Sequence, residues 1–366
     1  MTLMRVLIAV PRLAMPGGVA NYYRTLRPYL DEQKVYFEIG NKFGDSGGWG
    51  AIRRLLADYW QFHRALRGPR VELVHINPSL GSRSVVRDGL LLLIAKAHGC
   101  PVVVFFRGWD PGCEAVIRRR FLWLFRAVYG RADAFILLSD EFRRALIEMG
   151  IDKPVFAETT VVDDAVFASV PAISMQSDAE ADAPCSLLFL SRLDTGKGLS
   201  EALDAFAGLR KMWPGVTLTV AGDGPEKAVA EAAVARRGLT GVTFVGHIQG
   251  AVKDQAFQAA DIFFFPTFYG EGMPNAVLEA MAFGLPVVTR PVGGVRDFFE
   301  DGRMGFISES ADPAVYAELL SRLVSDPALR KRMGQYNRDF ARKKFSASLV
   351  AGRLVSIYAK IAGKAG

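Results

Sequence analysis

Residues 262–289 read IFFFPTFYGEGMPNAVLEAMAFGLPVVT, and this stretch decides the fold of the C-terminal half. Two short apolar runs, 262–265 and 286–289, enclose a segment with helical spacing at 276–283. Short runs of this kind are typical of parallel strands that are covered on both faces. A strand, a helix and a second strand in this order predict a right-handed crossover in a parallel sheet.

The same alternation extends over most of the chain. We expect further strands at 6–10, 71–76, 102–106, 134–138, 187–190, 216–220 and 242–245, and helices at 51–66, 114–129, 199–212 and 226–236. Small, polar and proline residues without an apolar period predict a linker between the halves. The sequence therefore predicts an α/β protein of two Rossmann-like domains, residues 1–170 and 186–345. The linker is expected at 171–185, and residues 346–366 should form a helix that packs back on the N-terminal domain.

Composition fits a compact protein with about two domains, since half of the 366 residues are apolar and 23% are charged. The longest apolar runs, such as 89–95, fall short of the ~20 residues that a membrane-spanning helix needs. The N-terminus reads as a first strand and not as a signal peptide. Cys100, Cys113 and Cys185 have no metal-ligand spacing, which favours a reducing cytoplasm.

The basic excess lies in the first half of the chain. Residues 1–170 contain 23 Lys and Arg and 17 Asp and Glu, a net charge of +6, and the remainder has a net charge of +1. Segments 53–70 and 118–126 mix arginines with large apolar residues, which suits docking on anionic lipid. In the alternative interpretation Phe121, Leu122 and Phe125 belong to the core and the arginines form a solvated face. No recognisable nucleic-acid-binding module is present.

Three segments at strand-to-helix turns carry the candidate chemistry. The first contains Gly17 and Gly18, directly after the first strand. Paired glycines let the backbone approach a phosphate at a helix N-terminus, although a tight turn alone would also explain them. The nicotinamide fingerprint Gly-x-Gly-x-x-Gly is absent at this turn, which disfavours a dehydrogenase.

The second segment, 191–198, places Arg192 and Lys197 five residues apart in a turn with two glycines. Arginine holds phosphate oxygens through a planar fork and lysine acts as a point charge, so the pair could neutralise a departing diphosphate. The alternative is a solvated loop with ordinary surface charges.

The third segment places Glu271 in the loop before a helix and Glu279 one turn inside it, on an otherwise apolar face. A buried carboxylate needs hydrogen-bond donors, and a ribose diol would supply two. Backbone amides could satisfy Glu279 instead. Gly272, Met273, Pro274 and Asn275 at the start of this helix are further candidates for binding the donor. All of them except Pro274 offer a backbone N–H group.

The combination Glu-Gly-x-Pro-Asn-x3-Glu-Ala-Met-Ala-x-Gly-Leu-Pro-Val-Val, with Ser-Arg-Leu-x3-Lys-Gly and Ala-Gly-Asp-Gly-Pro (221–225) upstream, resembles the group 1, family 4 retaining glycosyltransferases. The resemblance spans nearly the whole chain and is strongest in the C-terminal half. It implies the GT-B fold, in which two Rossmann-like domains face a central cleft and the C-terminal domain binds the nucleotide sugar.

The resemblance also implies roles for individual residues. Arg192 and Lys197 would hold the diphosphate, Glu271 the hydroxyls of the donor sugar and Glu279 the ribose. Gly18 would offer its amide to the phosphate, and Gly246 and Ile248 would lie by the base. The implied reaction is a metal-independent front-face transfer without a protein nucleophile, and no Asp-x-Asp pair occurs in the sequence.

The implied donor is a UDP- or GDP-sugar, and the implied acceptor is a glycan or a lipid-linked sugar in bacterial envelope or exopolysaccharide assembly. The expected location is the cytoplasm, at the inner face of the membrane if the basic segments bind lipid. A sugar-nucleotide 2-epimerase and a non-catalytic nucleotide-sugar binder are the alternative functions.

One position departs from the family pattern. Arg107 stands where family members usually carry a histidine, in the segment Arg107-Gly108-Trp109-Asp110. Arginine cannot act as a general base near neutral pH, but it can hold an anion. We therefore expect Arg107 to bind a charged group on the acceptor or donor, and a structural ion pair with Asp110 is the alternative.

Overall fold

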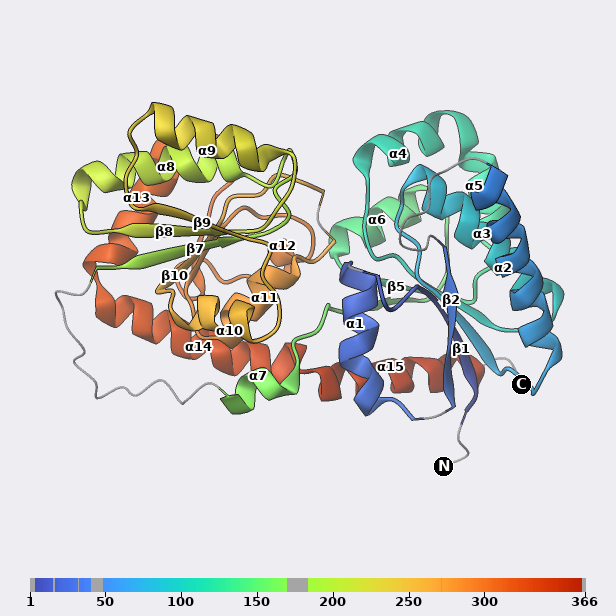
Figure 1. Ribbon diagram of the computed structural model, residues 1–366. Coiled ribbons are helices and arrows are strands. Elements are labelled where there is room, and N and C mark those ends of the chain that lie inside the picture. Colours follow the sequence, from blue (N-terminus) through green and yellow to red (C-terminus); the bar gives the residue numbers. More distant parts are fainter. Residues whose placement is uncertain are drawn as a thin grey trace. The chain divides into compact units, whose positions relative to one another are not determined.

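The computed structural model describes residues 4–15, 17–31, 33–40, 49–169, 184–270 and 272–363. The chain divides into two compact units, Met1–Val161 with Ala347–Gly366 (unit 1) and Val162–Ser346 (unit 2). Each unit is built on one six-stranded sheet in which all paired strands run parallel (Figure 1). The predicted α/β class with two parallel sheets is confirmed. Most of the expected linker, 171–185, lies outside the described residues.

Unit 1 has the strand order β2-β1-β3-β4-β5-β6. Its strands are β1 Val6–Pro11, β2 Lys34–Ile39, β3 Leu73–Ile76, β4 Val102–Phe105, β5 Ala134–Leu137 and β6 Val155–Ala157. Every residue of β3, β4 and β5 is buried, which explains their continuous apolar sequences. The edge strands β2 and β6 are only partly buried, and they carry no comparable apolar signal.

The helices of unit 1 are α1 Gly18–Leu26, η1 Arg27–Tyr29, α2 Trp49–Arg67, α3 Ser82–Ala97, α4 Pro111–Val116, η2 Ile117–Phe121, α5 Leu122–Tyr129, α6 Asp140–Glu148 and α15 Ala347–Ala362. The helical stretch predicted at 114–129 is confirmed, with a π-helical turn, η2, between α4 and α5. Residues eight apart on a regular α-helix point about 80° apart. The wider turn brings Ile117 and Phe125 onto one face, and both are buried.

Helix α15 belongs to unit 1 although it follows all of unit 2 in the chain. It packs against α1 and η1. Arg353 of α15 donates from Nε and Nη2 to the buried carboxylate of Glu158, at 2.6 and 2.9 Å. The Tyr358 hydroxyl lies 2.6 Å from Nδ1 of His75.

Unit 2 has the strand order β12-β11-β10-β7-β8-β9. Its strands are β7 Ser186–Leu190, β8 Thr217–Ala221, β9 Val242–Gly246, β10 Ile262–Phe265, β11 Val287–Thr289 and β12 Gly305–Ile307. Its helices are α7 Asp164–Ser169, α8 Leu199–Met212, α9 Glu226–Arg236, α10 Ala251–Gln258, α11 Asn275–Ala282, α12 Val295–Phe298, α13 Pro313–Ser325 and α14 Pro327–Phe345. Helices α8, α9 and α13 lie on one side of the sheet and α10, α11 and α14 on the other (Figure 1).

The stretch 262–289 forms the crossover β10-α11-β11. Phe263 of β10 pairs with Val287 of β11 in parallel register. The strand begins at Val287 and not at Pro286, which has no N–H to donate to the ladder. Gly284, with φ +81°, ends α11 in the left-handed conformation, and its N–H donates to Met281 O.

Within the described residues, no helix combines the length and the apolar character that a membrane crossing would require.

Candidate functional site

The candidate site of unit 2 lies where its sheet topology changes direction. From β7 the chain moves outward through β8 and β9 on one side, and it then returns to β10 on the other side of β7. Connections that diverge from neighbouring parallel strands leave a crevice at their carboxyl ends, where ligands of doubly wound sheets bind. The loop 191–198 follows β7 and the loop 266–274 follows β10, so the two sharpest sequence motifs flank this point.

These two loops are joined by hydrogen bonds. The carbonyl of Gly196 accepts hydrogen bonds from Phe268 N (3.0 Å) and Thr267 Oγ1 (3.2 Å). Gly198 has φ +83°, and a Cβ there would lie 2.4 Å from the Pro266 carbonyl oxygen. Only glycine lets the backbone at position 198 approach Pro266 this closely, so the glycine is what permits the contact between the two loops.

The two predicted phosphate cations differ in exposure. The Arg192 side chain is 72% exposed, and its guanidinium forms a 3.0 Å ion pair with Asp194. Lys197 is only 7% exposed, and its Nζ lies 4.0 Å from the centre of the Tyr269 ring. The ring thus holds the ammonium group by a cation–π contact at the junction of the loops. The solvated-loop alternative fits Arg192 but not Lys197.

The start of α11 presents backbone groups beside this junction. Gly272, Met273 and Pro274 are buried, Pro274 occupies the N-cap position, and no side chain caps the helix. Gly272 O accepts a 2.9 Å hydrogen bond from Gly294 N in the loop after β11. The first N–H groups of a helix lack intrahelical partners, so this end can receive an anion or a hydroxyl. Glu271 lies outside the described residues.

Glu279 has a partner that sequence reasoning missed. Its Oε1 accepts a 2.8 Å hydrogen bond from Lys253 Nζ, and only 12% of the Glu279 side chain is exposed. Lys253 lies on α10, 26 positions earlier, and no local pattern links the two residues. The partner of Oε1 is thus a lysine and not a backbone amide.

The loops after β8 and β9 close the same edge of the sheet. Gly246 has φ +70°, and its carbonyl accepts a 2.7 Å hydrogen bond from Gly222 N. A Cβ on Gly222 would lie 1.8 Å from Ser191 O. Gly246, the last residue of β9, and the partly buried Ile248 thus lie at the same edge of the sheet as the loop that carries Arg192 and Lys197.

In unit 1 the glycine pair begins α1. Gly17 is the N-cap, with φ +150° and no capping side chain, and a Cβ there would meet nothing within 4 Å. Gly18 is the first residue of the helix. The turn follows β1, which lies between β2 and β3 where the topology of this sheet changes direction. The position is compatible with both interpretations, an anion site and a tight turn.

Arg107 follows β4 and is stacked on aromatic rings. Its guanidinium carbon lies 3.8 Å from the ring centre of Tyr22 and 4.3 Å from that of Phe105. Its Nε and Nη1 are buried without a hydrogen-bond partner, as is the Tyr22 hydroxyl. The expected alternative, an ion pair with Asp110, does not form, because Asp110 caps α4 by accepting from Gly112 N and Cys113 N. Buried polar atoms without partners are unusual and point to a bound group.

A neutral histidine lies near Arg107. His75 is completely buried on β3, between the hydroxyls of Tyr23 (3.3 Å) and Tyr358 (2.6 Å). Burial and the nearby Arg107 charge lower the pKa of His75 to about 3, against a weaker raising effect of Asn77. Burial also raises the pKa of Tyr22. Arg107 therefore lies beside a buried neutral histidine and a buried tyrosine.

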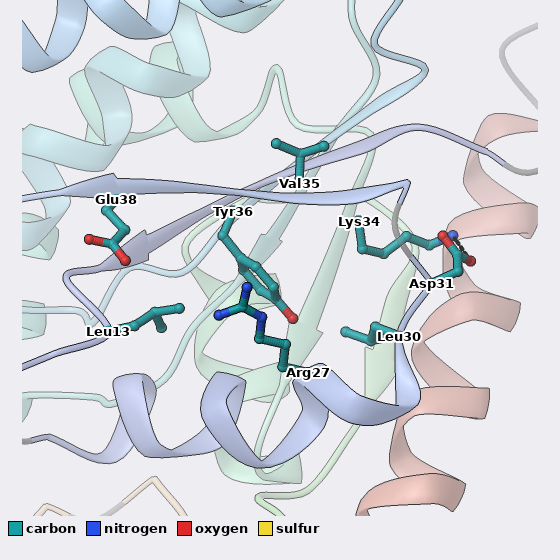
Figure 2. Close-up of a pocket in the computed structure, with 8 residues that line it drawn as sticks. All are labelled: Leu13, Arg27, Leu30, Asp31, Lys34, Val35, Tyr36 and Glu38. Atoms are coloured by element: carbon teal, nitrogen blue, oxygen red, sulfur yellow. Dashed lines mark hydrogen bonds and ion pairs between the residues drawn. The ribbon is translucent and has the colours of Figure 1, made fainter.

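A separate pocket of about 550 Å³ lies along β2 and contains none of the predicted site residues (Figure 2). Arg27 of η1 extends beside the ring of Tyr36. Burial raises the pKa of Tyr36 to about 12. Lys34 and Asp31 form a 2.7 Å ion pair at the other end. The lining residues are Leu13, Arg27, Leu30, Asp31, Lys34, Val35, Tyr36 and Glu38.

One further cation near the unit 2 site was not predicted from the sequence. Arg290 directly follows β11, and its guanidinium carbon lies 5.5 Å from the Phe268 ring centre and 5.7 Å from that of Tyr316. Its Nε is buried without a hydrogen-bond partner. A cation at the carboxyl end of a buried strand is the signal that could have identified it.

Among the residues that the structure describes, no three His, Cys, Asp or Glu side chains gather where they could hold a metal ion.

Curated relatives match parts of the chain. Glycogen synthase of Mycobacterium tuberculosis is 29% identical over 253 residues, which cover 69% of this chain and 59% of that protein. The phosphatidyl-myo-inositol mannosyltransferase of Mycobacterium leprae is 31% identical over 179 residues, 48% of this chain and 47% of that protein. The chain thus spans about half to three fifths of the length of these relatives.

Solved structures match over the whole length. Sucrose-phosphate synthase of Thermosynechococcus elongatus aligns over 99% of this chain and 100% of its own, with a TM-score of 0.77 and 18% identity. HepE of Anabaena, in complex with UDP-glucose, aligns over 98% and 100%, with a TM-score of 0.74 and 19% identity. These similarities establish the GT-B fold.

Two family profiles cover most of the sequence. The profile of group 1 glycosyl transferases matches residues 173–340, and that of the glycosyl transferase 4-like domain matches residues 11–157. With the fold and the motif loops of unit 2, these matches show that the chain belongs to the group 1, family 4 glycosyltransferases.

Proposed function

We propose that this protein is a retaining glycosyltransferase that moves a sugar from a nucleoside-diphosphate donor to a hydroxyl of an acceptor. The observation that supports it most is the junction at the switch point of unit 2. There Lys197 lies against Tyr269 beside the uncapped start of α11. A buried ammonium and free backbone N–H groups together suit a diphosphate and the sugar attached to it.

In the proposed reaction the bond between the sugar C1 and the diphosphate oxygen breaks while the acceptor oxygen bonds to C1 on the same face. The acceptor proton moves to an oxygen of the leaving diphosphate, so no protein nucleophile is needed. Lys197 and Arg192 would stabilise the negative charge that grows on the diphosphate. Glu271 would bind the hydroxyls of the donor sugar, and no metal ion takes part in this proposal.

The donor is proposed to be a UDP- or GDP-sugar, with its ribose on Glu279 and its base near Gly246 and Ile248. Because the similar HepE was solved with UDP-glucose, that sugar nucleotide is the first to test. Lys253 would orient the Glu279 carboxylate as an acceptor for the ribose hydroxyls. Arg107, with two buried nitrogens lacking partners, would bind an anionic group of the acceptor or donor.

The acceptor is proposed to be a glycan or lipid-linked sugar of bacterial envelope or exopolysaccharide assembly, met in the cytoplasm at the inner face of the membrane. No observation on the described residues favours a sugar-nucleotide 2-epimerase or a non-catalytic binder. Conversion of the donor into its 2-epimer without any acceptor would identify the former, and binding without any turnover would identify the latter.

A thermal-shift screen with UDP-glucose, GDP-mannose and ADP-glucose in EDTA tests the donor site. A donor at a hundred times its dissociation constant should add about 2.7 kcal/mol of stability. Lys197→Ala should abolish the shift, whereas Lys211→Ala, an exposed lysine of α8, should keep it. No shift with any of the three donors, or a shift that Lys197→Ala leaves intact, would contradict the assigned site.

A separate measurement tests whether the transferred sugar keeps its anomeric configuration. Once a donor and an acceptor are paired, NMR of the first product should show the anomeric configuration of the donor. An inverted product would exclude the front-face mechanism while leaving the donor site in place.

A further inference from the structure

Helix α2 has two apolar faces, and unit 1 covers only one of them. Phe62 and Leu66 are buried against the unit. On the outer face Trp49 is 82% exposed and Trp60 is 61% exposed, with the exposed Ile52 and Leu56 between them. These four positions are spaced three, four and four residues apart, so they form one continuous line along the helix.

Helices on the same side of unit 1 also expose large apolar side chains. Helix α3 contacts both α2 and α5, and Figure 1 shows the three helices on the same side of the unit 1 sheet. Phe121 and Trp123, at the η2–α5 junction, are exposed, Trp123 by 70%. We call Trp49, Ile52, Leu56 and Trp60 the tryptophan surface. The core interpretation of segment 118–126 therefore holds for Phe125 but not for Phe121.

The charges around the tryptophan surface have one sign. Asp58, the sole acid of α2, is buried and accepts from Gly40 N. Asp88, the sole acid of α3, is buried and paired with Arg87 at 2.7 Å. Helix α5 and η2 contain no acid. The arginines exposed on these helices are Arg53, Arg64, Arg67, Arg83, Arg119, Arg120 and Arg126, and no acidic side chain is exposed there.

An apolar line flanked by arginines favours one of three possible partners. A second copy of the chain would bring arginines against arginines in a two-fold interface, which is repulsive. A nucleic acid would use the arginines but would leave Ile52 and Leu56 against water. An anionic bilayer matches both features, because its headgroups attract arginine and its interface accommodates tryptophan and aliphatic side chains.

We propose that the tryptophan surface docks unit 1 on an anionic lipid bilayer, with α2 lying in the plane of the interface. The apolar line enters the boundary between headgroups and acyl chains, and the flanking arginines contact lipid phosphates. Docking concerns the surface of unit 1 and not the donor site of unit 2. It therefore goes beyond the proposed transfer reaction and can fail or succeed independently of it.

Flotation of the full-length chain with lipid vesicles, without any nucleotide sugar, tests the proposal. Vesicles of phosphatidylcholine with about one third phosphatidylglycerol should bind the protein at low salt, more tightly than pure phosphatidylcholine does. Leu56→Ser with Trp60→Ser should weaken this binding at least about tenfold. The matched control is the double variant Val229→Ser with Met212→Ser, which replaces two exposed apolar residues of unit 2. This control should bind the anionic vesicles as tightly as the unchanged protein does.

Since the replaced side chains are exposed, both double variants should retain the circular dichroism spectrum of the parent. Brominated lipids should also quench tryptophan fluorescence in the parent more than in the Leu56/Trp60 variant. No flotation at low salt, or equal flotation with neutral and anionic vesicles, would overturn the proposal. A dimer in sedimentation velocity that the Leu56/Trp60 variant abolishes would assign the surface to a second copy instead.

Discussion

Glu279 shows how a single residue of the candidate site depends on a distant one. Its carboxylate is mostly buried on an apolar helix face, and Lys253 supplies a hydrogen bond to Oε1. Lys253→Met should lower the free energy of unfolding by about 1–3 kcal/mol, because it leaves a mostly buried carboxylate without this donor. Urea unfolding measures the loss.

The matched control is Arg296→Met, which removes an exposed ion pair with Glu309. An exposed pair contributes little, so the loss should stay below about 0.5 kcal/mol. Equal losses in the two variants would show that the Lys253–Glu279 pair behaves as a solvated surface pair.

His75 predicts that the free energy of unfolding depends on pH. Its pKa falls from the usual 6.5 to about 3 on folding. Between these values the unfolded chain binds a proton that the folded protein does not bind, so stability falls as the pH drops below about 6.5. The contribution to the slope is at most about 1.4 kcal/mol per pH unit.

Urea unfolding at a series of pH values from 4 to 7 checks this. His75→Gln should make the dependence less steep, whatever its effect on stability at pH 7. His247→Gln replaces an exposed histidine and should leave the slope unchanged. A slope that persists in His75→Gln would assign the acid sensitivity to other groups.

Among the elements, the turn from β7 to α8 has a strict backbone requirement. At Gly198 both a positive φ and the Pro266 carbonyl oxygen exclude a side chain. Gly198→Ala should destabilise unit 2 by more than about 2 kcal/mol, since strain and a steric clash combine. It should also weaken donor binding, because it separates the loops that carry Lys197 and Tyr269.

Gly250, the N-cap of α10, is the comparison, because its φ is +57° and a Cβ would meet nothing within 4 Å. Gly250→Ala should therefore cost backbone strain without a steric clash, about 1–3 kcal/mol. Thermal unfolding and the donor-induced shift, measured on both variants, separate the two effects. A milder effect at Gly198 than at Gly250 would contradict the proposed close approach.

The central elements could be predicted from sequence more readily than the edges. Helix α8 and strand β10 occupy the predicted residues, because their apolar patterns are long or uninterrupted. Helix α9 also occupies the predicted residues, because its sequence is rich in alanine, a strong helix former. Strands β2, β6 and β12 were not predicted. They lie at sheet edges, and β6 and β12 have three residues each, so a local pattern could not distinguish them from loops.

At the scale of the molecule, unit 1 is assembled from both ends of the chain. A chain that stops after Ser346 would lack Arg353, the partner of the buried Glu158, and Tyr358, the partner of His75. We expect this truncation to destabilise unit 1 and to spare unit 2, because Val162–Ser346 is continuous. Hydrogen exchange should accelerate in β1 to β6 and not in β7 to β12, and a uniform acceleration would contradict the division into units.

The sequence by itself determined the α/β class, the two parallel sheets and the loops that carry the family motifs. These follow from local patterns, since an apolar run, a glycine turn and a helical period act over neighbouring residues. Tertiary structure alone decided that Lys253 meets Glu279, that Arg107 keeps two nitrogens without partners, and that one apolar face of α2 stays exposed. Such features depend on which distant surfaces come together, and a helical period shows that a face is apolar without showing what covers it.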